Sequence, residues 1–307
     1  MVNRKNVLDE LKIKPPQKSA FEIETSEHFP KLHTCLIASG KRGSGKSCSI
    51  ANYVRACYDR GYFDKVWCIT PTYASNKEIW DMIPINPDNV MEPTKTCMKE
   101  LTELIMQERN SWDEFLERKK QYEQYLKDMK NEKLDLSDKN VLDRLLNYEE
   151  HKFFDDKPVW HYRNEVPPRL AVIIDDCIGS DLMRLPSAKL TSFVCNHRHH
   201  GNSLGVSIFM LVQSYACREG VARCIRENCT HLMLFRVAQE QQIKKVYEEA
   251  DVDMSYEEFY EIIREVHEEP YAFFFFDFAP KKPEYRFRKN FDEFIIPNTT
   301  ANDDHKK

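Results

Sequence analysis

This sequence predicts an α/β fold with a doubly wound, mainly parallel β-sheet, and three observations lead to it. The first is a set of five short apolar runs, typical of buried strands, with helical segments between them. The second is a glycine-rich loop between the first of these runs and a helix. The third is an apolar run that ends in two aspartates. Because ligands of doubly wound sheets bind at the carboxyl ends of the strands, we expect the loop and the aspartates at one edge.

The five apolar runs are the expected strands of the sheet, and they cover residues 32–38, 65–70, 170–176, 205–214 and 231–236. Apolar runs of this length are typical of strands that are buried on both faces. Helices are expected at residues 49–58 and, in a short form, at 76–83. Two late runs, at 271–278 and 285–287, predict a β-hairpin on an edge of the sheet.

The loop at residues 40–47 fits the phosphate-binding pattern GxxxxGK[ST]. Its glycines let the backbone curl so that N–H groups and the positive end of the following helix converge on a phosphate. Lys46 is expected to reach the β- and γ-phosphate oxygens, and Ser47 to ligate Mg²⁺. The expected nucleotide-binding residues are Gly40, Lys41, Arg42, Gly43, Ser44, Gly45, Lys46, Ser47 and Cys48.

Polar side chains close two of the later apolar runs. Asp175 and Asp176 end the run at 170–176, where Asp175 is expected to hold the magnesium ion. Asp176 is the candidate base for the attacking water, although Glu, which is one methylene longer, often has this role. Gln213 ends the run at 205–214. If that strand lies between the loop strand and the acid-bearing strand, Gln213 faces the γ-phosphate and can sense it or position water.

A long segment separates the second strand from the third. The gap between residues 70 and 170 exceeds a single crossover connection, so the sequence predicts an insertion. Apolar residues recur at three- and four-residue spacing from 99 to about 130, and the period resumes after a break at 131–137. We therefore expect a helical hairpin at about 99–157, either a solvated insertion without chemistry or a contact with a partner or another subunit.

The amino-acid composition of the chain limits the classes of protein to which it can belong. The chain has 307 residues, of which 41% are hydrophobic and 31% charged, as in an ordinary soluble protein. Its formal net charge of −5 argues against a surface coated with nucleic acid but permits a confined basic channel. Ten cysteines without a CxxC pair favour reduced intracellular thiols over a zinc site. No apolar run is long enough for a membrane span or a secretion signal, so we expect a soluble protein that is not secreted.

Five motifs follow one another along the chain: GKRGSGKS, VWCITPTYASNKEIW, LAVIIDDCIGSDL, NHRHHGNSLGVSIFMLVQSY and IRENCTHLMLFR. Together they resemble the viral genome-packaging ATPases of the poxvirus type, which belong to the FtsK–HerA superfamily. The resemblance runs from about residue 29 to about 287; the N-terminal arm is not covered, and the helical insertion departs from the family in length. It implies a RecA-like P-loop NTPase fold, ATP hydrolysis, an oligomeric ring and movement of double-stranded DNA into a preformed capsid.

The resemblance also implies roles for single residues. Lys46 and Ser47 match the phosphate loop, the Asp175–Asp176 pair matches the acidic motif, and Gln213 matches the polar residue that closes the sensor strand. Arg198 and Arg226 lie where such motors place arginines near a neighbour's nucleotide, to stabilise charge on the γ-phosphoryl oxygens. Three extra residues, 201–203, weaken the match of Arg198. The alternative for both arginines is a surface position or a DNA phosphate contact.

The expected organisation is an N-terminal arm at 1–26, a P-loop ATPase domain at 27–300 and a polar tail at 301–307. ATP and Mg²⁺ are the expected cofactors. The expected partners are double-stranded DNA, bound through its phosphates without sequence preference, and further copies of the chain in a ring, with capsid proteins as another option. The expected location is the host cytoplasm or a viral factory, with association with the virion left open.

Two basic clusters are candidates for DNA contact, although short basic runs are usually solvated surface. They are Arg218, Arg223 and Arg226, and then Lys281, Lys282, Arg286, Arg288 and Lys289. Two other functions stay open: a nucleotide-dependent switch or assembly scaffold with slow turnover, and a small-molecule or nucleotide kinase. The chain lacks an evident arginine-rich lid for a kinase and an NKxD segment for guanine recognition.

Overall fold

A computed structural model describes residues 23–130, 137–154, 156–177, 179–183, 188–216, 221–236 and 239–297. In this part of the chain the strands are β1 (Cys35–Ser39), β2 (Lys65–Ile69), β3 (Val90–Met91), β4 (Leu170–Asp175), β5 (Ser207–Val212), β6 (His231–Phe235), β7 (Phe273–Asp277), β8 (Phe287–Lys289) and β9 (Glu293–Ile295). The helices are α1 (Lys46–Asp59), α2 (Lys77–Trp80), α3 (Cys97–Lys130), α4 (Lys139–Glu150), α5 (Ala188–Cys195), α6 (His200–Ser203), α7 (Arg223–Glu227), α8 (Glu240–Ala250) and α9 (Tyr256–Val266).

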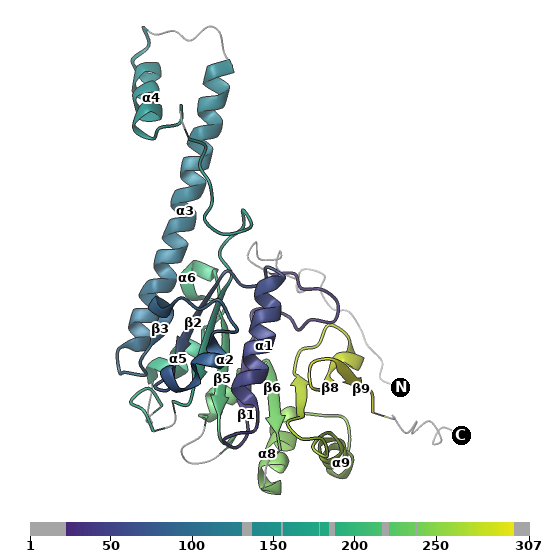
Figure 1. Cartoon of the computed structure of the whole chain (residues 1–307). Helices are drawn as coiled ribbons and strands as arrows, with labels where there is room; N and C mark the ends of the chain where they lie inside the picture. Colours follow the sequence, from purple (N-terminus) through teal and green to yellow (C-terminus); the bar gives the residue numbers. More distant parts are fainter. Residues whose placement is uncertain are drawn as a thin grey trace, which may run out of the picture.

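All of these strands form one mixed sheet in the order β3-β2-β4-β5-β1-β6-β7-β8-β9 (Figure 1). The six strands from β3 to β6 in this order are parallel, and β7, β8 and β9 add antiparallel pairs at one end. The mainly parallel, doubly wound sheet and the late β-hairpin expected from the sequence are thus confirmed. Strand β5 lies between β1 and β4, which is the arrangement on which the role of Gln213 depends.

Helices cover both faces of the sheet. On one face, α1 and α2 bury residues such as Val54 and Trp80 against Leu36 and Ile173 of the strands. The other face is covered by the first turns of α3 and by α5, α7, α8 and α9, which pack on side chains such as Ile37. Burial on both faces explains why the central strands are continuous apolar runs without alternation.

The inserted segment is a helical hairpin that projects from the body of the molecule (Figure 1). Helix α3 has 34 residues, so it is about 50 Å long. Its first turns are in the core, where Glu108 accepts hydrogen bonds from Lys65 Nζ and the Tyr162 hydroxyl, both at 2.7 Å. Near its far end, the Tyr148 hydroxyl of α4 donates to Asp128 at 2.7 Å. The two predicted helices are therefore present, whereas the predicted break at 131–137 lies almost wholly outside the described residues.

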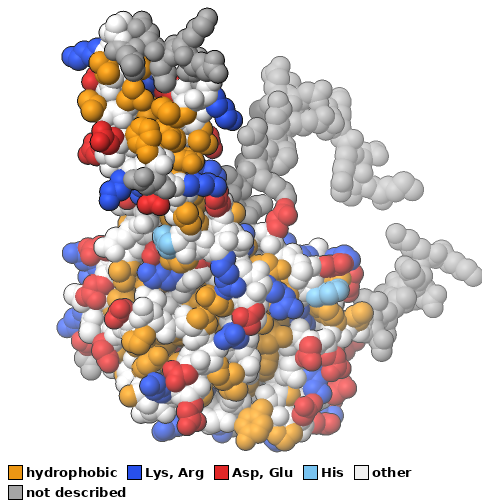
Figure 2. Space-filling view, turned by 45° about the horizontal axis from the view of Figure 1, so that its top comes forward, with side chains coloured by type: hydrophobic (Ala, Val, Ile, Leu, Met, Phe, Trp, Pro, Cys, Tyr) orange, Lys and Arg blue, Asp and Glu red, His pale blue; other side chains and the backbone are white. Residues whose placement is uncertain are grey.

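The surface of this projection carries apolar side chains, as Figure 2 shows. Among the exposed ones are Leu126, Met129, Leu142, Leu146 and Phe154. The described residues include no helix that combines the length and apolar character needed to cross a membrane.

Several elements differ from the expectations. Only Phe287 of the run at 285–287 is in a strand, because Pro283–Tyr285 forms a 3₁₀ turn before β8. The helix expected at 76–83 is a short 3₁₀ turn followed by one turn of α2. Strands β3 and β9 and helices α8 and α9 were not anticipated, although the pair Ser255 and Glu258 forms a capping box that marks the start of α9.

Candidate functional site

The glycine-rich loop joins β1 to α1 at the carboxyl edge of the parallel strands. Gly43 has a φ of +76° and Gly45, which precedes α1, a φ of +97°, a conformation that costs glycine little. Gly40 is needed for space, since a Cβ there would lie 2.6 Å from Phe235 Cβ. Its N–H donates to Val212 O at 3.1 Å, which ties the loop to the end of β5. The loop thus has the curled backbone that a phosphate-binding site requires.

Lys46 and Ser47 lie at the first turn of α1 and face into the site. Lys46 Nζ donates to Gly40 O at 2.6 Å and to Lys41 O at 2.9 Å, so the ammonium group lies across the loop. Burial lowers the pKa of Lys46, and the negative charges of Asp175 and Asp176 oppose this shift. A cationic amine held here by the loop is suited to bind an anionic ligand.

The hydroxyl of Ser47 donates to Asp175 Oδ2 at 3.1 Å. This contact brings the phosphate loop and the end of β4 together, as the sequence predicted for a shared metal site. The pKa of Asp175 is raised to about 6, mainly by burial and also by the charge of Asp176, while the Ser47 hydroxyl opposes this shift. A charged carboxylate that is buried is unfavourable in free energy unless a cation lies near it. Together with the serine hydroxyl, this carboxylate offers oxygen ligands that suit a hard cation such as Mg²⁺.

Asp176 and Gln213 follow β4 and β5 at the same edge. Asp176 has a φ of +51°, which is uncommon outside glycine and tolerated best by Asn and Asp. Both residues line a cleft of about 470 Å³. The cleft is also lined by most of the expected nucleotide-binding residues, namely Arg42, Gly43, Ser44, Gly45, Lys46, Ser47 and Cys48. The structure therefore brings the predicted loop, acids and Gln213 into one concave site.

The wall of the cleft beyond β2 was not predicted. Thr72, Ser75, Asn76 and Ile79 line it. Asn76 Nδ2 donates to Thr72 Oγ1 at 3.1 Å, and that hydroxyl lies 3.2 Å from Thr70 Oγ1. One feature of the sequence could have predicted this wall: a buried strand is followed by the polar stretch Thr-Pro-Thr-Tyr-Ala-Ser-Asn. Polar residues that follow parallel strands lie at the edge of the sheet where ligands bind.

Arg226 does not fit its expected role. Its guanidinium makes a bidentate ion pair with Glu249, at 2.9 and 2.8 Å, and donates to Val221 O at 2.5 Å. The side chain is 9% exposed and lies over the ring of Tyr215. An arginine that is buried and paired in its own subunit is not available to a neighbour's nucleotide or to DNA, so its geometry is that of a structural residue.

Arg198 is exposed, at the other edge of the sheet. The carbonyl of its neighbour His197 accepts from Val206 N at 2.8 Å, just before β5 begins. Arg198 therefore lies near the amino ends of the strands, away from the cleft of its own chain. A surface position of this kind is compatible with a contact to another subunit.

The remaining basic residues divide into three groups. Arg218 lies outside the described residues, and Arg223 is exposed and pairs with Glu227 on its own helix. The later cluster is occupied within the chain: Lys281 donates to Thr25, Lys282 to Glu27, Arg286 to Ala250 O, Arg288 to His28 O, and Lys289 pairs with Glu269. This cluster holds the segment at 25–28 and the ends of α8 and α9 in place, so its expected role as a DNA contact is not supported.

The histidines around Arg198 have local partners. His197 Nδ1 lies 3.0 Å from Val194 O, and the His200 ring stacks on Phe193 with its Nε2 2.9 Å from Phe193 O. In the parts of the chain that the structure describes, no three His, Cys, Asp or Glu side chains group as metal ligands would.

No protein-family model and no curated protein matches the chain. Similar solved structures include the genome packaging NTPase B204 of Sulfolobus turreted icosahedral virus 2 with ATP-γ-S, at 9% identity and a TM-score of 0.44, over 83% of this chain and 95% of that one. The pCW3 conjugation coupling protein TcpA has 15% identity and a TM-score of 0.43, over 81% and 59% of the two chains. EssC (ATPases 2 and 3) of Geobacillus thermodenitrificans has 10% identity and a TM-score of 0.42, over 87% and 40%.

These neighbours decide neither the superfamily that the sequence motifs resemble nor its poxvirus type. At TM-scores below 0.5 the likeness carries no argument about function. The sheet order and the site geometry of this chain are therefore the structural evidence for what it does.

The burial of Asp175 makes a prediction about stability. Its pKa of about 6 exceeds the value of about 3.9 for an unfolded chain, so the folded state binds more protons between these values and loses stability as pH rises through them. Asp175→Asn removes the buried charge. We expect it to raise the free energy of unfolding by about 1–3 kcal/mol at pH 7.5, and by less at pH 5, in Mg²⁺-free denaturant titrations.

The control for this variant is Asp88→Asn, since Asp88 is exposed. It should change stability by less than about 0.5 kcal/mol at either pH. A destabilised Asp175→Asn at pH 7.5 would contradict the assignment of Asp175 as a carboxylate held at a cost to folding.

The ion pair of Arg226 makes a second prediction. Arg226→Ala leaves Glu249 without its partner, so we expect a loss of about 2–4 kcal/mol of stability, measured by denaturant unfolding. Arg223→Ala removes an exposed pair on the same helix and should cost less than about 0.5 kcal/mol. If Arg226→Ala is as stable as the wild type, the structural role of Arg226 is contradicted. Arg226 is then again a candidate for a role between subunits.

Proposed function

We propose that this chain, which has the fold and phosphate loop of a P-loop NTPase, is an ATPase that moves double-stranded DNA into a preformed viral capsid. The single observation that carries the ATPase part is the hydrogen bond between Ser47 Oγ and Asp175 Oδ2, at 3.1 Å. This contact supports the proposal, because a serine hydroxyl and a carboxylate beside a glycine-rich loop are oxygen ligands that suit Mg²⁺. A glycine-rich loop without the acidic partner would support binding of a phosphate but not its transfer.

Each part of the site has a distinct task in this proposal. The loop N–H groups and Lys46 hold the phosphates, and Ser47 and Asp175 hold Mg²⁺, which supplies neutralisation of charge on the phosphate oxygens. Asp176 and Gln213 line the same cleft and orient the attacking water, with Asp176 as the candidate proton acceptor. Hydrolysis is favoured over transfer to another acceptor because Gln213 suits the positioning of a water molecule.

The DNA part of the proposal depends on the order of the five sequence motifs and on their resemblance to packaging ATPases. Contacts would go to phosphates, because a pump must move along any sequence. The residues of the cluster at 281–289 have partners within the chain, so we place the DNA-binding surface elsewhere, with the exposed Arg198 and Arg223 as candidates. The alternative is a nucleotide-dependent switch or scaffold, which would bind ATP and turn it over slowly without a response to DNA.

Lys46→Ala should abolish ATP hydrolysis without loss of the fold, because it removes the cation that contacts the phosphates. In steady-state assays we expect wild-type turnover to rise with duplex DNA and with protein concentration as a ring forms. Lys99→Ala, an exposed lysine of α3, is the matched control and should hydrolyse ATP as the wild type does. Normal turnover in Lys46→Ala would overturn the ATPase site; wild-type turnover that ignores DNA would favour the switch.

Mixing variants tests whether Arg198 acts between subunits. Arg198→Ala subunits retain their own loop and Asp175, while Asp175→Ala subunits still supply Arg198 to a neighbour, so a mixture should recover activity that neither has alone. A mixture of Lys46→Ala and Asp175→Ala is the control and should stay inactive, because each defect lies in the subunit's own site. No recovery at any ratio would contradict the shared site.

A further inference from the structure

The sheet order sets the direction in which a nucleotide lies on the loop. The metal-binding pair and Gln213 lie toward β5 and β4, on one side of β1. A Mg²⁺ ion held by that pair would neutralise charge on the terminal phosphates, so the γ-phosphate end of a bound triphosphate would face that side. In this orientation the α-phosphate and the nucleoside would leave the loop on the other side of β1, toward β6 and β7.

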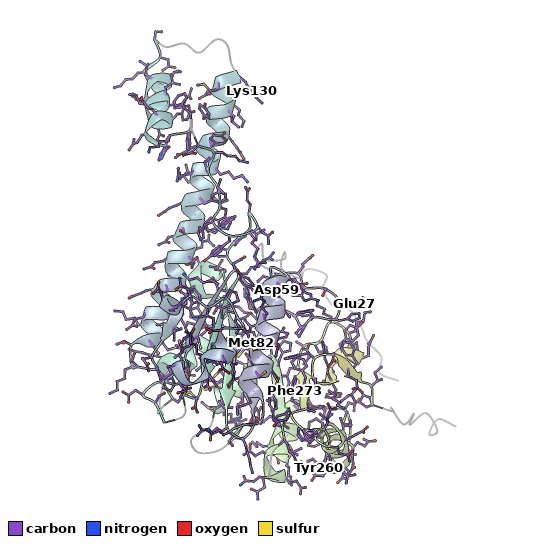
Figure 3. All side chains as sticks on the ribbon, in the orientation of Figure 1. Glu27, Asp59, Met82, Lys130, Tyr260 and Phe273 are labelled. Atoms are coloured by element: carbon purple, nitrogen blue, oxygen red, sulfur yellow. The ribbon has the colours of Figure 1, made fainter. Side chains whose placement is uncertain are left out.

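Tyr271 lies at that place. It comes two residues before β7, whose first residue, Phe273, pairs with Phe235 at the end of β6. Figure 3 labels Phe273, beside the lower end of α1, where the helix begins. The Tyr271 ring lies against the phosphate loop, since its Cδ1 is 3.7 Å from the position of a Cβ on Gly45. An aromatic ring thus borders the loop on the side opposite the metal-binding pair.

Tyr271 is one of the most exposed large hydrophobic residues that the structure describes. Its side chain is 73% exposed, and among the described residues it has no aromatic ring partner. Most large aromatic side chains of this chain are instead buried, as are Phe235 and Phe274. An exposed ring next to a ligand-binding loop is available for stacking.

The backbone of Tyr271 is also unfavourable. Pro270 precedes it, its φ is +65°, and Ala272 N donates to Glu269 O at 3.3 Å. A turn with proline in its second position and a positive φ in its third normally has Gly or Asn there, because a bulky side chain is strained. Strain of this kind persists mainly where the residue serves a function, so the ring is present at a cost to the turn.

We propose that Tyr271 is the stacking surface for the base of the bound nucleotide. This inference rests on the proposed function, because it assumes that the triphosphate occupies the loop. Stacking recognises the flat face of an aromatic base, so it adds affinity for a nucleoside triphosphate that inorganic tripolyphosphate cannot gain. Tyr271 is therefore a binding residue and not a catalytic one.

Calorimetric titration with Mg·ATP and with Mg·tripolyphosphate tests this assignment. Tyr271→Gly removes the ring and suits the positive φ, so thermal stability should not fall. We expect affinity for Mg·ATP to fall about tenfold or more, and affinity for Mg·tripolyphosphate to change less than twofold. Tyr271→Phe keeps the ring and should bind both ligands within about twofold of the wild type.

Two results would overturn the inference: unchanged Mg·ATP affinity in Tyr271→Gly, or an equal loss of affinity for both ligands. Lys46→Ala separates this failure from failure of the proposed function. If the phosphate loop is the site, Lys46→Ala weakens both ligands, because both carry the phosphate chain. If Lys46→Ala weakens neither, the phosphate-loop assignment fails, and the stacking role of Tyr271 fails with it.

Discussion

The contact between Ser47 and Asp175 is the interaction on which the rest of the site depends. Ser47 lies in α1, which follows β1, whereas Asp175 ends β4. Strand β5 separates β1 from β4, so these two strands lie about 10 Å apart. The loop and the first turn of α1 cross this distance over the end of β5. An order that placed β4 farther from β1 would move the acid away from the loop. The parallel pairing of β1, β5 and β4 therefore matters more to the site than any single side chain.

The same arrangement explains why the site lowers the stability of the folded protein. Asp175 is buried with Asp176 next to it, Lys46 loses hydration, and the loop depends on positive φ angles at Gly43 and Gly45. The two buried charged groups oppose stability, whereas the glycines adopt these angles at little cost. Tyr271 follows the same pattern on the far side of the loop, where an exposed ring lies on a strained turn.

Much of the fold could be predicted from the sequence, because buried strands and the phosphate loop have strong local signals. From the sequence alone, the pattern around Lys46 and the acids at the end of β4 predicted that the site lies at one edge of the sheet. The ion-pair partner of a charged side chain has no local signal in the sequence. Arg226 could be identified only as a basic residue, because Glu249 is brought against it by the fold. The partners of the cluster at 281–289 could not be predicted for the same reason, since its acceptors are mostly backbone carbonyls far away in the chain. The sequence did not single out Tyr271, because residue type predicts neither the exposure of a side chain nor a positive φ.

The most direct test of the metal and phosphate assignment is an experimental structure of the protein with Mg²⁺ and a non-hydrolysable ATP analogue. We expect the metal between Ser47 Oγ and a carboxylate oxygen of Asp175, with the phosphates enclosed by the loop at 40–47. Phosphates bound outside that loop, or a metal held without Asp175, would contradict the assignment.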